Sequence, residues 1–198
     1  RIVLDEPSHL FYPYIFEWNG TYYMTPESYQ AGSVRLYKAT KFPINWTFVK
    51  TILEGGEYVD PSIFRFDCRW WLFTGPRASD ALRLFYADDL LGQWTEHPES
   101  PVIEGRRDIA RPAGRVVMRD GSIIRYAQND ETVYGRQVRA FEVLEITTTS
   151  YAERPLGEEP LLQPSGFGWN AERMHHIDAH QIGEDAWIAC VDGYGRTT

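Results

Sequence analysis

The sequence predicts an all-β protein, specifically a β-propeller of four-stranded antiparallel blades. Two observations predict this fold. Residues 59–73, VDPSIFRFDCRWWLF, indicate two short strands joined by a tight polar turn, and residues 12–24, YPYIFEWNGTYYM, show the same layout 48 residues earlier when the prolines are aligned. RLYKAT at 35–40 matches RLFYAD at 83–88 with the same offset of 48. A unit of about four short strands in roughly 50 residues is typical of a propeller blade.

Looser copies of the hairpin cover residues 111–124 and 177–190, so four repeats are visible. We therefore predict a single domain over residues 1–198, with a ring of four or five blades. Residues 1–6 precede the first hairpin as an outer strand would. Either this strand completes the last blade and closes a four-bladed ring, or the chain is most of a five-bladed ring that lacks its first blade.

Within the repeats, residues 25–32 and 74–80 are rich in turn-forming residues and are expected to link the second and third strands. In the third repeat we expect the third strand at 134–139 and the fourth at 141–148. Residues 154–170 hold several prolines and glycines and are expected to form a long loop between blades. No segment combines a helix start signal with an amphipathic period.

Composition limits the partners. The net charge of −8 argues against nucleic acid or an anionic membrane as a partner, since phosphate groups require a basic face.

Aromatic residues make up 15% of the chain, and most are expected to fill the spaces between blades. Cys68 and Cys190 have no metal-binding or disulfide spacing, so we expect free thiols. No segment has the length of a membrane span or the pattern of a signal peptide, and we predict a cytoplasmic protein.

Unpaired edge strands at both ends of such a ring favour association with a second copy. We therefore include a homo-oligomer formed through edge strands among the predictions.

In a propeller the innermost strands all run the same way past the central axis, so equivalent positions lie close together. The residue before each first-strand proline is such a position, occupied here by Tyr12, Asp60 and Arg111, with Asp178 aligned in the fourth repeat. The ends of the second strands should lie nearby, and these include Glu27 and Gln128.

Three carboxylates are therefore candidate catalytic residues: Glu27, Asp60 and Asp178. Hydrolysis of a glycosidic bond needs one carboxylate to activate water and another, with a raised pKa, to protonate the leaving oxygen. The structural alternative is that an aspartate before proline only caps a turn. Likewise Arg111 is either a substrate-binding residue or only an ion-pair partner.

The segment 174–180, MHHIDAH, is the other concentration of polar residues. His176, Asp178 and His180 share one face of a strand, but three ligands within five residues would point too far apart for a good metal site. We therefore predict no metal and no cofactor, and assign His176 to substrate binding. Ser62 lacks the Gly-x-Ser-x-Gly pattern, so a serine hydrolase is disfavoured.

Residues 59–64, 69–73 and 84–94 resemble the blade motifs of five-bladed propeller glycosidases of the family 43 type. More closely, residues 12–18, 24–28, 110–114 and 175–179 are similar to the N-terminal propeller domain of glucosamine inositolphosphorylceramide transferases and its bacterial relatives. The glycosidase resemblance implies three carboxylates from separate blades, acting as base, pKa modulator and acid. It places one of them at Asp60, whereas Tyr12 and Arg111 depart from the pattern.

The leading hypothesis is a glycoside hydrolase with a carbohydrate substrate, using paired carboxylates in a central pocket. Its substrate-binding residues are predicted to be Tyr12, Trp18, His176, Arg111 and Gln128. The alternative is a non-catalytic sugar-binding or scaffolding propeller associated with a glycosyltransferase, and a promiscuous esterase is third. Carboxylates flanking an open pocket would support hydrolysis, whereas acids each neutralised by an arginine would support binding.

Overall fold

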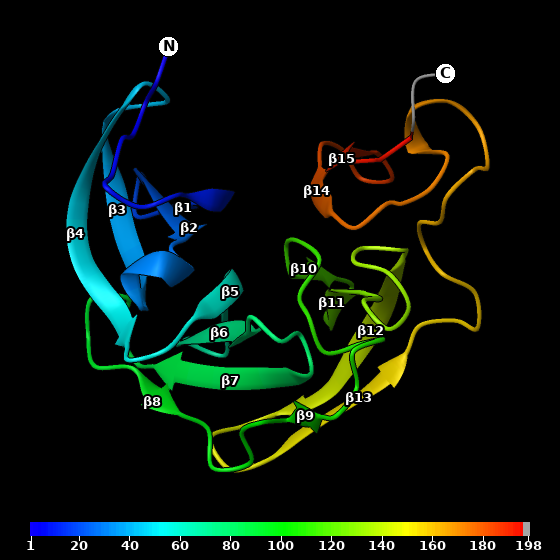
Figure 1. Cartoon of the computed structure of the whole chain (residues 1–198). Coiled ribbons are helices and arrows are strands. Elements are labelled where there is room, and N and C mark those ends of the chain that lie inside the picture. The colour runs from blue at the N-terminus through cyan, green and yellow to red at the C-terminus, as the bar shows by residue number, and fades with distance from the viewer. Residues whose placement is uncertain (196–198) are drawn as a thin grey trace.

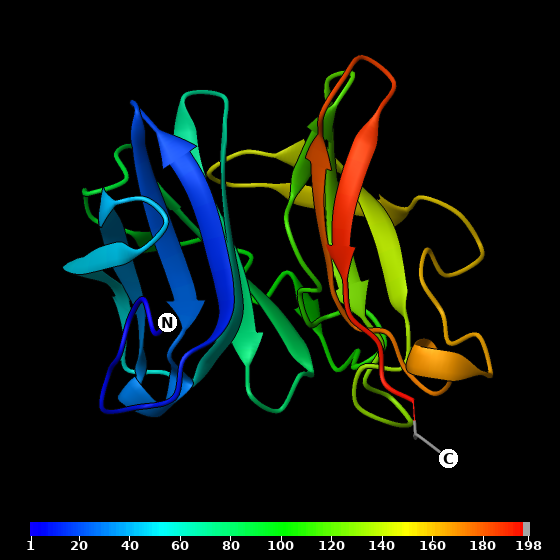
Figure 2. The same ribbon diagram turned by 90° about the horizontal axis from the view of Figure 1, so that it is seen from above.

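The computed structural model describes residues 1–195 and confirms an all-β fold of antiparallel sheets, in which the first three sheets follow the four-stranded blade pattern and the last has two strands among the described residues. The sheets follow one another around an arc, from β1–β4 through β5–β9 and β10–β13 to β14–β15 (Figure 1). Seen from above, the first and last sheets stand upright on opposite sides (Figure 2). The last three residues of the predicted domain 1–198 lie outside the described part.

The first two sheets correspond to the two repeats that are 48 residues apart. The strands of the first sheet are β1 (Phe11–Trp18), β2 (Thr21–Glu27), β3 (Ser33–Lys41) and β4 (Asn45–Glu54), with a 3-10 turn, η1 (Tyr29–Ala31), before β3. Those of the second are β5 (Tyr58–Phe66), β6 (Arg69–Pro76), β7 (Ala81–Ala87), β8 (Thr95–Glu96) and β9 (Ile103–Glu104). Both β8 and β9 pair with β7, so the outer strand of this blade is split.

The third and fourth sheets are the looser repeats. The third holds β10 (Val117–Arg119), β11 (Ser122–Gln128), β12 (Val138–Ile146) and β13 (Tyr151–Pro155). The fourth holds β14 (Ile177–Gln181) and β15 (Trp187–Val191), and a 3-10 turn, η2 (Gly168–Asn170), precedes it. Among the described residues, β15 pairs only with β14.

Three predictions about individual strands are wrong. Residues 1–6 form no strand; instead Glu6 binds Arg35 and Tyr37 of β3, so this segment lies against the first blade and does not complete the last one. The third strand of the third blade is β12, not 134–139, because Asp130 Oδ1 accepts a hydrogen bond from the Gly135 N–H and closes a loop there. The predicted fourth strand, 141–148, lies largely within β12. The fourth strand is instead β13, which begins before the predicted interblade loop at 154–170.

The turns of the first three hairpins share one geometry. Asn19-Gly20, Asp67-Cys68 and Asp120-Gly121 all have positive φ at both central residues. Two-residue hairpins favour such turns because their twist matches that of the strands, and asparagine, aspartate and glycine tolerate positive φ best. The turn residues therefore fix the register of each inner hairpin.

The hydrophobic core lies between adjacent blades, and β6 shows how. Trp70 and Leu72 pack into the cluster shared with the first blade, while Trp71 and Phe73 pack into the cluster shared with the third. Successive residues of a strand point to opposite faces, so a strand between two neighbours is apolar on both. All four side chains are buried. Most aromatic residues therefore have a packing role, as expected.

The third and fourth blades meet through backbone contact at Gly114. The Ile177 N–H donates to the Ala113 carbonyl at 2.8 Å, and a Cβ at position 114 would lie 1.7 Å from the Ile177 carbonyl oxygen. Gly114 also has a φ of 142°, which disfavours other residues. Only glycine fits this junction, which places β14 beside the central axis.

Both cysteines are free, as predicted, and the structure shows that both are exposed. Within residues 1–195 there is no helix with the length and apolar character needed to cross a membrane.

Candidate functional site

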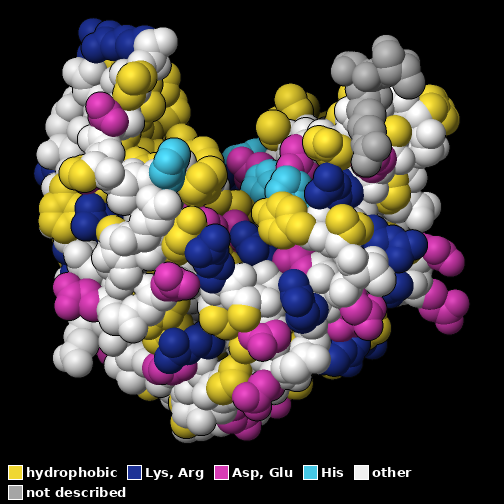
Figure 3. Space-filling model, viewed as in Figure 1, with side chains coloured by type: hydrophobic (Ala, Val, Ile, Leu, Met, Phe, Trp, Pro, Cys, Tyr) yellow, Lys and Arg dark blue, Asp and Glu magenta, His cyan; other side chains and the backbone are white. Residues whose placement is uncertain are grey.

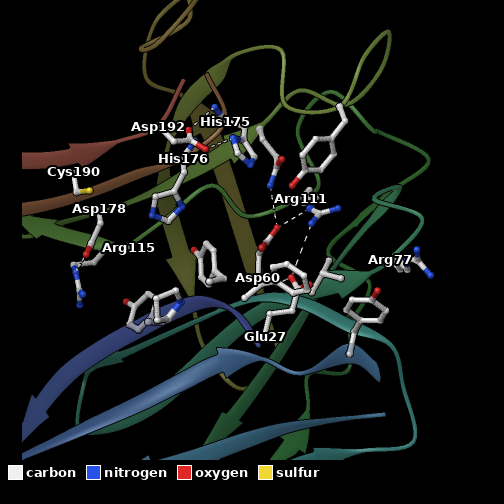
Figure 4. Close-up of a pocket in the computed structure, with 18 residues that line it drawn as sticks. Glu27, Asp60, Arg77, Arg111, Arg115, His175, His176, Asp178, Cys190 and Asp192 are labelled. Atoms are coloured by element: carbon white, nitrogen blue, oxygen red, sulfur yellow. Dashed lines mark hydrogen bonds and ion pairs between the residues drawn. The ribbon is translucent and has the colours of Figure 1, made fainter. Parts of the chain in front are cut away.

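A pocket of about 620 Å³ opens at the central axis and receives side chains from all four blades (Figure 4). The space-filling view shows histidine, acidic and basic side chains gathered where the surface is hollowed between the first and last blades (Figure 3). The pocket is lined by Phe11, Tyr12, Pro13, Tyr14, Glu27, Tyr29, Val59, Asp60, Arg77, Arg111, Arg115, Gln128, Tyr134, His175, His176, Asp178, Cys190 and Asp192.

Tyr12 and Asp60 enter the pocket through the same irregularity of their strands. Each precedes a proline and has a φ of 47°, and in each strand the pairing register shifts at this point. A bulge of this kind bends the strand and redirects a side chain, at a cost of about 1–3 kcal/mol for a non-glycine residue at positive φ. The two repeats thus use one backbone device to place two different side chains beside the axis.

Asp60 is held by two donors from the third blade. Arg111 Nε donates to Asp60 Oδ2 at 2.6 Å, and Gln128 Nε2 donates to the same oxygen at 2.9 Å. The second Nε2 hydrogen of Gln128 reaches the Pro112 carbonyl at 2.8 Å. Asp60 is 5% exposed and Arg111 8% exposed, so this is a buried ion pair.

Glu27, at the end of β2, completes the contact between the first two blades. Its Oε2 accepts a hydrogen bond from the Asp60 backbone N–H at 2.9 Å and lies 4.0 Å from Arg111 Nη2. Burial, followed by the negative charge of Asp60, raises the pKa of Glu27 from 4.5 to about 7. A carboxyl group with this pKa exchanges a proton near neutral pH.

Arg111 lies close to more than one carboxylate. Its Nη1 donates to Ser79 Oγ at 3.0 Å and lies 3.9 Å from Asp130 Oδ2. Burial lowers the pKa of this guanidinium, but Asp60, Tyr134 and Asp130 together outweigh burial, and the pKa lies above its ordinary value. Arg111 therefore remains a cation among three carboxylates: Glu27, Asp60 and Asp130.

Asp178, on β14, forms a second ion pair on another side of the pocket. Arg115 Nε donates to Asp178 Oδ1 at 2.6 Å, and His180 Nε2 lies 3.2 Å from Asp178 Oδ2. Burial raises the pKa of Asp178, but the bonds from Arg115 and His180 outweigh it and hold the pKa below its usual value. Arg115 also donates to the Ile15 carbonyl at 2.6 Å, and so ties the third blade to the first.

The two histidines before β14 are fixed by Asp192, which follows β15. Asp192 Oδ1 accepts the backbone N–H groups of His175 and His176, and its Oδ2 pairs with His175 Nδ1. The His176 ring meets the Tyr12 ring edge-on with centroids 5.0 Å apart. Burial lowers the pKa of His176, so its imidazole is neutral at pH 7.

The structure brings seven of the eight predicted site residues to this pocket: Tyr12, Glu27, Asp60, Arg111, Gln128, His176 and Asp178. It does not bring Trp18. The Trp18 ring packs edge-on against Trp70 at 5.2 Å and lies under the Arg65 guanidinium at 4.5 Å, between the first and second blades. Because Trp18 lies at the far end of β1 from Tyr12, it belongs to the interblade core.

Sequence reasoning missed several residues of the site. Asp130 and Ser79 lie in loops beyond strand ends, where the repeat carries no alignment signal. Arg115 lies within the motif used for Arg111, four residues on, and its register with Asp178 was not apparent. Across residues 1–195, no three His, Cys, Asp or Glu side chains are arranged to hold a metal ion.

The fold is a β-propeller, an architecture that is also found in carbohydrate-active enzymes. The catalytic domain of the GH62 α-L-arabinofuranosidase from Coprinopsis cinerea superposes with a TM-score of 0.71 over 96% of this chain and 68% of that one, at 13% identity. The GH43 enzyme of Xanthomonas citri complexed with xylotriose gives a TM-score of 0.60 over 90% of this chain and 65% of that one, also at 13% identity. At this identity the likeness shows the fold alone.

The chain belongs to the family described as "Glucosamine inositolphosphorylceramide transferase 1, N-terminal", whose model matches residues 1–194. The glucosamine inositolphosphorylceramide transferase 1 of Oryza sativa subsp. japonica is 36% identical over 201 residues. That match covers 97% of this chain and 27% of the rice protein. The chain thus spans about a quarter of the length of the curated relatives it matches.

Proposed function

We propose that the central pocket binds a carbohydrate and that this domain is a recognition module. One observation carries the proposal: Asp60 and Asp178, two of the three candidate acids, are each neutralised by an arginine at 2.6 Å. A carboxylate held in this way is a poor base and a poor nucleophile, because its charge is already compensated. Fixed polar groups of this kind orient the hydroxyl groups of a ligand instead.

The shape and lining of the pocket support a sugar as the ligand. A volume of about 620 Å³ accommodates a small saccharide, and the lining combines aromatic rings with fixed donors and acceptors. The curated relatives have glucosamine and inositolphosphorylceramide in their name, which supports a ligand of the carbohydrate class. The propeller would then present or select a sugar for an associated glycosyltransferase.

Glycoside hydrolysis is the second candidate, and one observation favours it. Glu27, with a pKa of about 7, lies beside Asp60 and could serve as the general acid that the reaction requires. In this mechanism Glu27 protonates the leaving oxygen and a second carboxylate activates water. The partner would have to be Asp60 or Asp178, both engaged by arginine.

Two parallel assays separate the candidates. Purified protein is tested for hydrolysis of a panel of nitrophenyl glycosides and one nitrophenyl ester, and for binding of the corresponding free sugars by calorimetry. Asp60→Asn and Asp178→Asn variants, checked for folding, are run beside it. The proposal predicts sugar binding without turnover. Glycoside turnover that is lost in a folded Asp60→Asn variant would establish the hydrolase, and ester turnover would establish the esterase.

A further inference from the structure

The strand β15 leaves one edge of the fourth blade uncovered. In the hairpin that joins it to β14, the Ile182 N–H donates to the Ala186 carbonyl at 2.9 Å. Hydrogen-bonded and non-hydrogen-bonded pairs alternate along an antiparallel ladder, so every second residue of β15 directs its backbone N–H and C=O away from β14. Among the described residues, these groups have no backbone partner; they belong to Trp187, Ala189 and Val191.

The edge strand β15 also lacks the charges that the other edge strands carry. In the described part of the chain, each of the other strands at a sheet edge contains at least one charged residue; these strands are β1, β4, β5, β8, β9, β10, β13 and β14. The sequence of β15, WIACV, contains neither a charge nor a proline. Charges and prolines on an edge strand oppose pairing with another chain. The edge of β15 therefore favours the addition of a further strand.

The two ends of this edge carry opposite charges. Glu184 and Asp185, in the turn before β15, are exposed, and neither forms an ion pair with another residue of 1–195. Beyond the other end, the Tyr194 N–H donates to the Arg173 carbonyl at 2.9 Å, and the Arg173 guanidinium lies 4.2 Å from the centre of the Tyr194 ring. Two such edges in antiparallel contact would bring the acidic end of each beside Arg173 of the other.

From these observations we infer that β15 is a dimerisation strand, which pairs antiparallel with β15 of a second copy of this chain. With the twofold axis at Ala189, Trp187 of each copy lies opposite Val191 of the other, and the free backbone groups form about six hydrogen bonds. The combined sheet has four strands, as the blade pattern requires. A second copy fits better than a flexible peptide, because its strand is already ordered and loses little conformational freedom on binding.

This pairing also brings the second copy to the border of the central pocket. Ile188 and Cys190 share one face of β15, and Cys190 lines the pocket. In the register centred on Ala189, Ile188 of one copy lies opposite Cys190 of the other. The inference does not depend on the carbohydrate-binding proposal, and the two are tested separately.

Sedimentation velocity at protein concentrations from about 2 to 300 µM tests the dimer. Because the strands are short, the contact is smaller than a standard interface of about 1,600 Å², and we expect a dissociation constant of about 10–100 µM. Ala189→Pro removes an N–H that faces away from β14, a place where an edge strand tolerates proline. This variant should keep the circular dichroism spectrum of the wild type and weaken the dimer at least about tenfold.

Charge reversal tests the same contact without changing the backbone. Arg173→Glu should weaken the dimer at least about threefold, and the further changes Glu184→Arg and Asp185→Arg in the same chain should restore it. The matched control is Lys41→Glu, which makes the same charge change at an exposed position of the first blade and should leave the dimer intact.

Oxidative cross-linking tests the register. In a Cys68→Ser background, Ile188→Cys places a thiol opposite the native Cys190 of the other copy, at a pair whose Cα atoms are about 4.5 Å apart and within reach of a disulfide. We expect a covalent dimer, and none when Cys190→Ser is added. Cross-linking that persists with Cys190→Ser would contradict this register.

A dimer that is unaffected by both Ala189→Pro and Arg173→Glu would place the contact elsewhere and overturn the inference. A monomer at every concentration would also overturn it, and would leave the β15 edge to a partner other than this chain.

Discussion

Arg111 and Asp60 form an ion pair, Nε to Oδ2 at 2.6 Å, that joins the second and third blades at the axis of the propeller. Asp60 also accepts a hydrogen bond from the Gln128 amide, and its backbone N–H donates to Glu27. The ion pair is therefore the centre of a hydrogen-bond network that spans three blades. Residues at equivalent places in the repeat thus act together. The same network sets the charge distribution of the pocket and connects the first three blades to one another.

Replacing Arg111 with methionine should destabilise the protein by about 3–5 kcal/mol at pH 7, because it leaves buried carboxylates without a counter-charge. The free energy of unfolding from urea denaturation measures this. The matched control is Arg119→Met, which breaks an exposed pair with Asp120 and should cost less than about 1 kcal/mol. Similar losses in the two variants would show that burial does not make the loss of the central ion pair more costly than the loss of an exposed one.

Glu27 should make stability depend on pH in a defined window. Its pKa is raised from 4.5 to about 7 in the folded state, so the folded protein binds the proton more tightly than the unfolded chain does. This contribution is fully present below pH 4.5 and is lost as pH rises to about 7. Each pKa unit corresponds to about 1.4 kcal/mol, so we expect a loss of about 1–3 kcal/mol.

The measurement is the free energy of unfolding of the wild type minus that of Glu27→Gln, taken from pH 4.5 to pH 8. Other carboxylates titrate in both proteins and cancel in the difference. The difference should fall with pH, and Glu27→Gln should be the more stable protein at pH 8. A flat difference would mean that Glu27 has its ordinary pKa.

Gly114→Ala should open the junction between the third and fourth blades. The added Cβ would collide with the Ile177 carbonyl, and relief of this contact would move β14 and Asp178 away from the pocket. The control is Gly121→Ala, also at positive φ but with nothing within 4 Å of the added Cβ. We expect Gly114→Ala to lose at least about 2 kcal/mol more stability than the control, measured by urea denaturation. Equal losses would indicate that only backbone strain matters at position 114.

The repeat made much of the fold and the site predictable. Aligned prolines placed Tyr12, Asp60 and Arg111 at one axis, and strand ends added Glu27 and Gln128, because a propeller converts equal sequence positions into neighbouring spatial ones. Prediction failed where the period was lost. Residues 1–6 match the apolar pattern of an outer strand, yet strand formation needs a partner with free backbone groups, which a sequence pattern does not reveal.

The prediction that Trp18 lines the pocket was wrong for a related reason. It shares a strand with Tyr12, but only the end of β1 that contains Tyr12 reaches the axis, and direction along a strand is not encoded in alternation. The pairing of Asp60 with Arg111 and of Asp178 with Arg115 depends on distances across blades. The sequence contains acidic and basic residues at these positions, but only the structure shows which carboxylate forms an ion pair with which arginine. These ion pairs are the reason that we propose binding rather than hydrolysis.

The most direct test of carbohydrate binding at the central pocket is saturation-transfer NMR with a mixture of monosaccharides, comparing the wild type with Cys190→Trp. Cys190 is exposed and lines the pocket, so a tryptophan there fills the cavity without disturbing the core, while the neighbouring Ala189→Trp, outside the pocket, serves as the control. We predict saturation transfer to at least one sugar with the wild type and Ala189→Trp, and its loss with Cys190→Trp. No transfer to any sugar, or equal transfer with all three proteins, would contradict binding at this pocket.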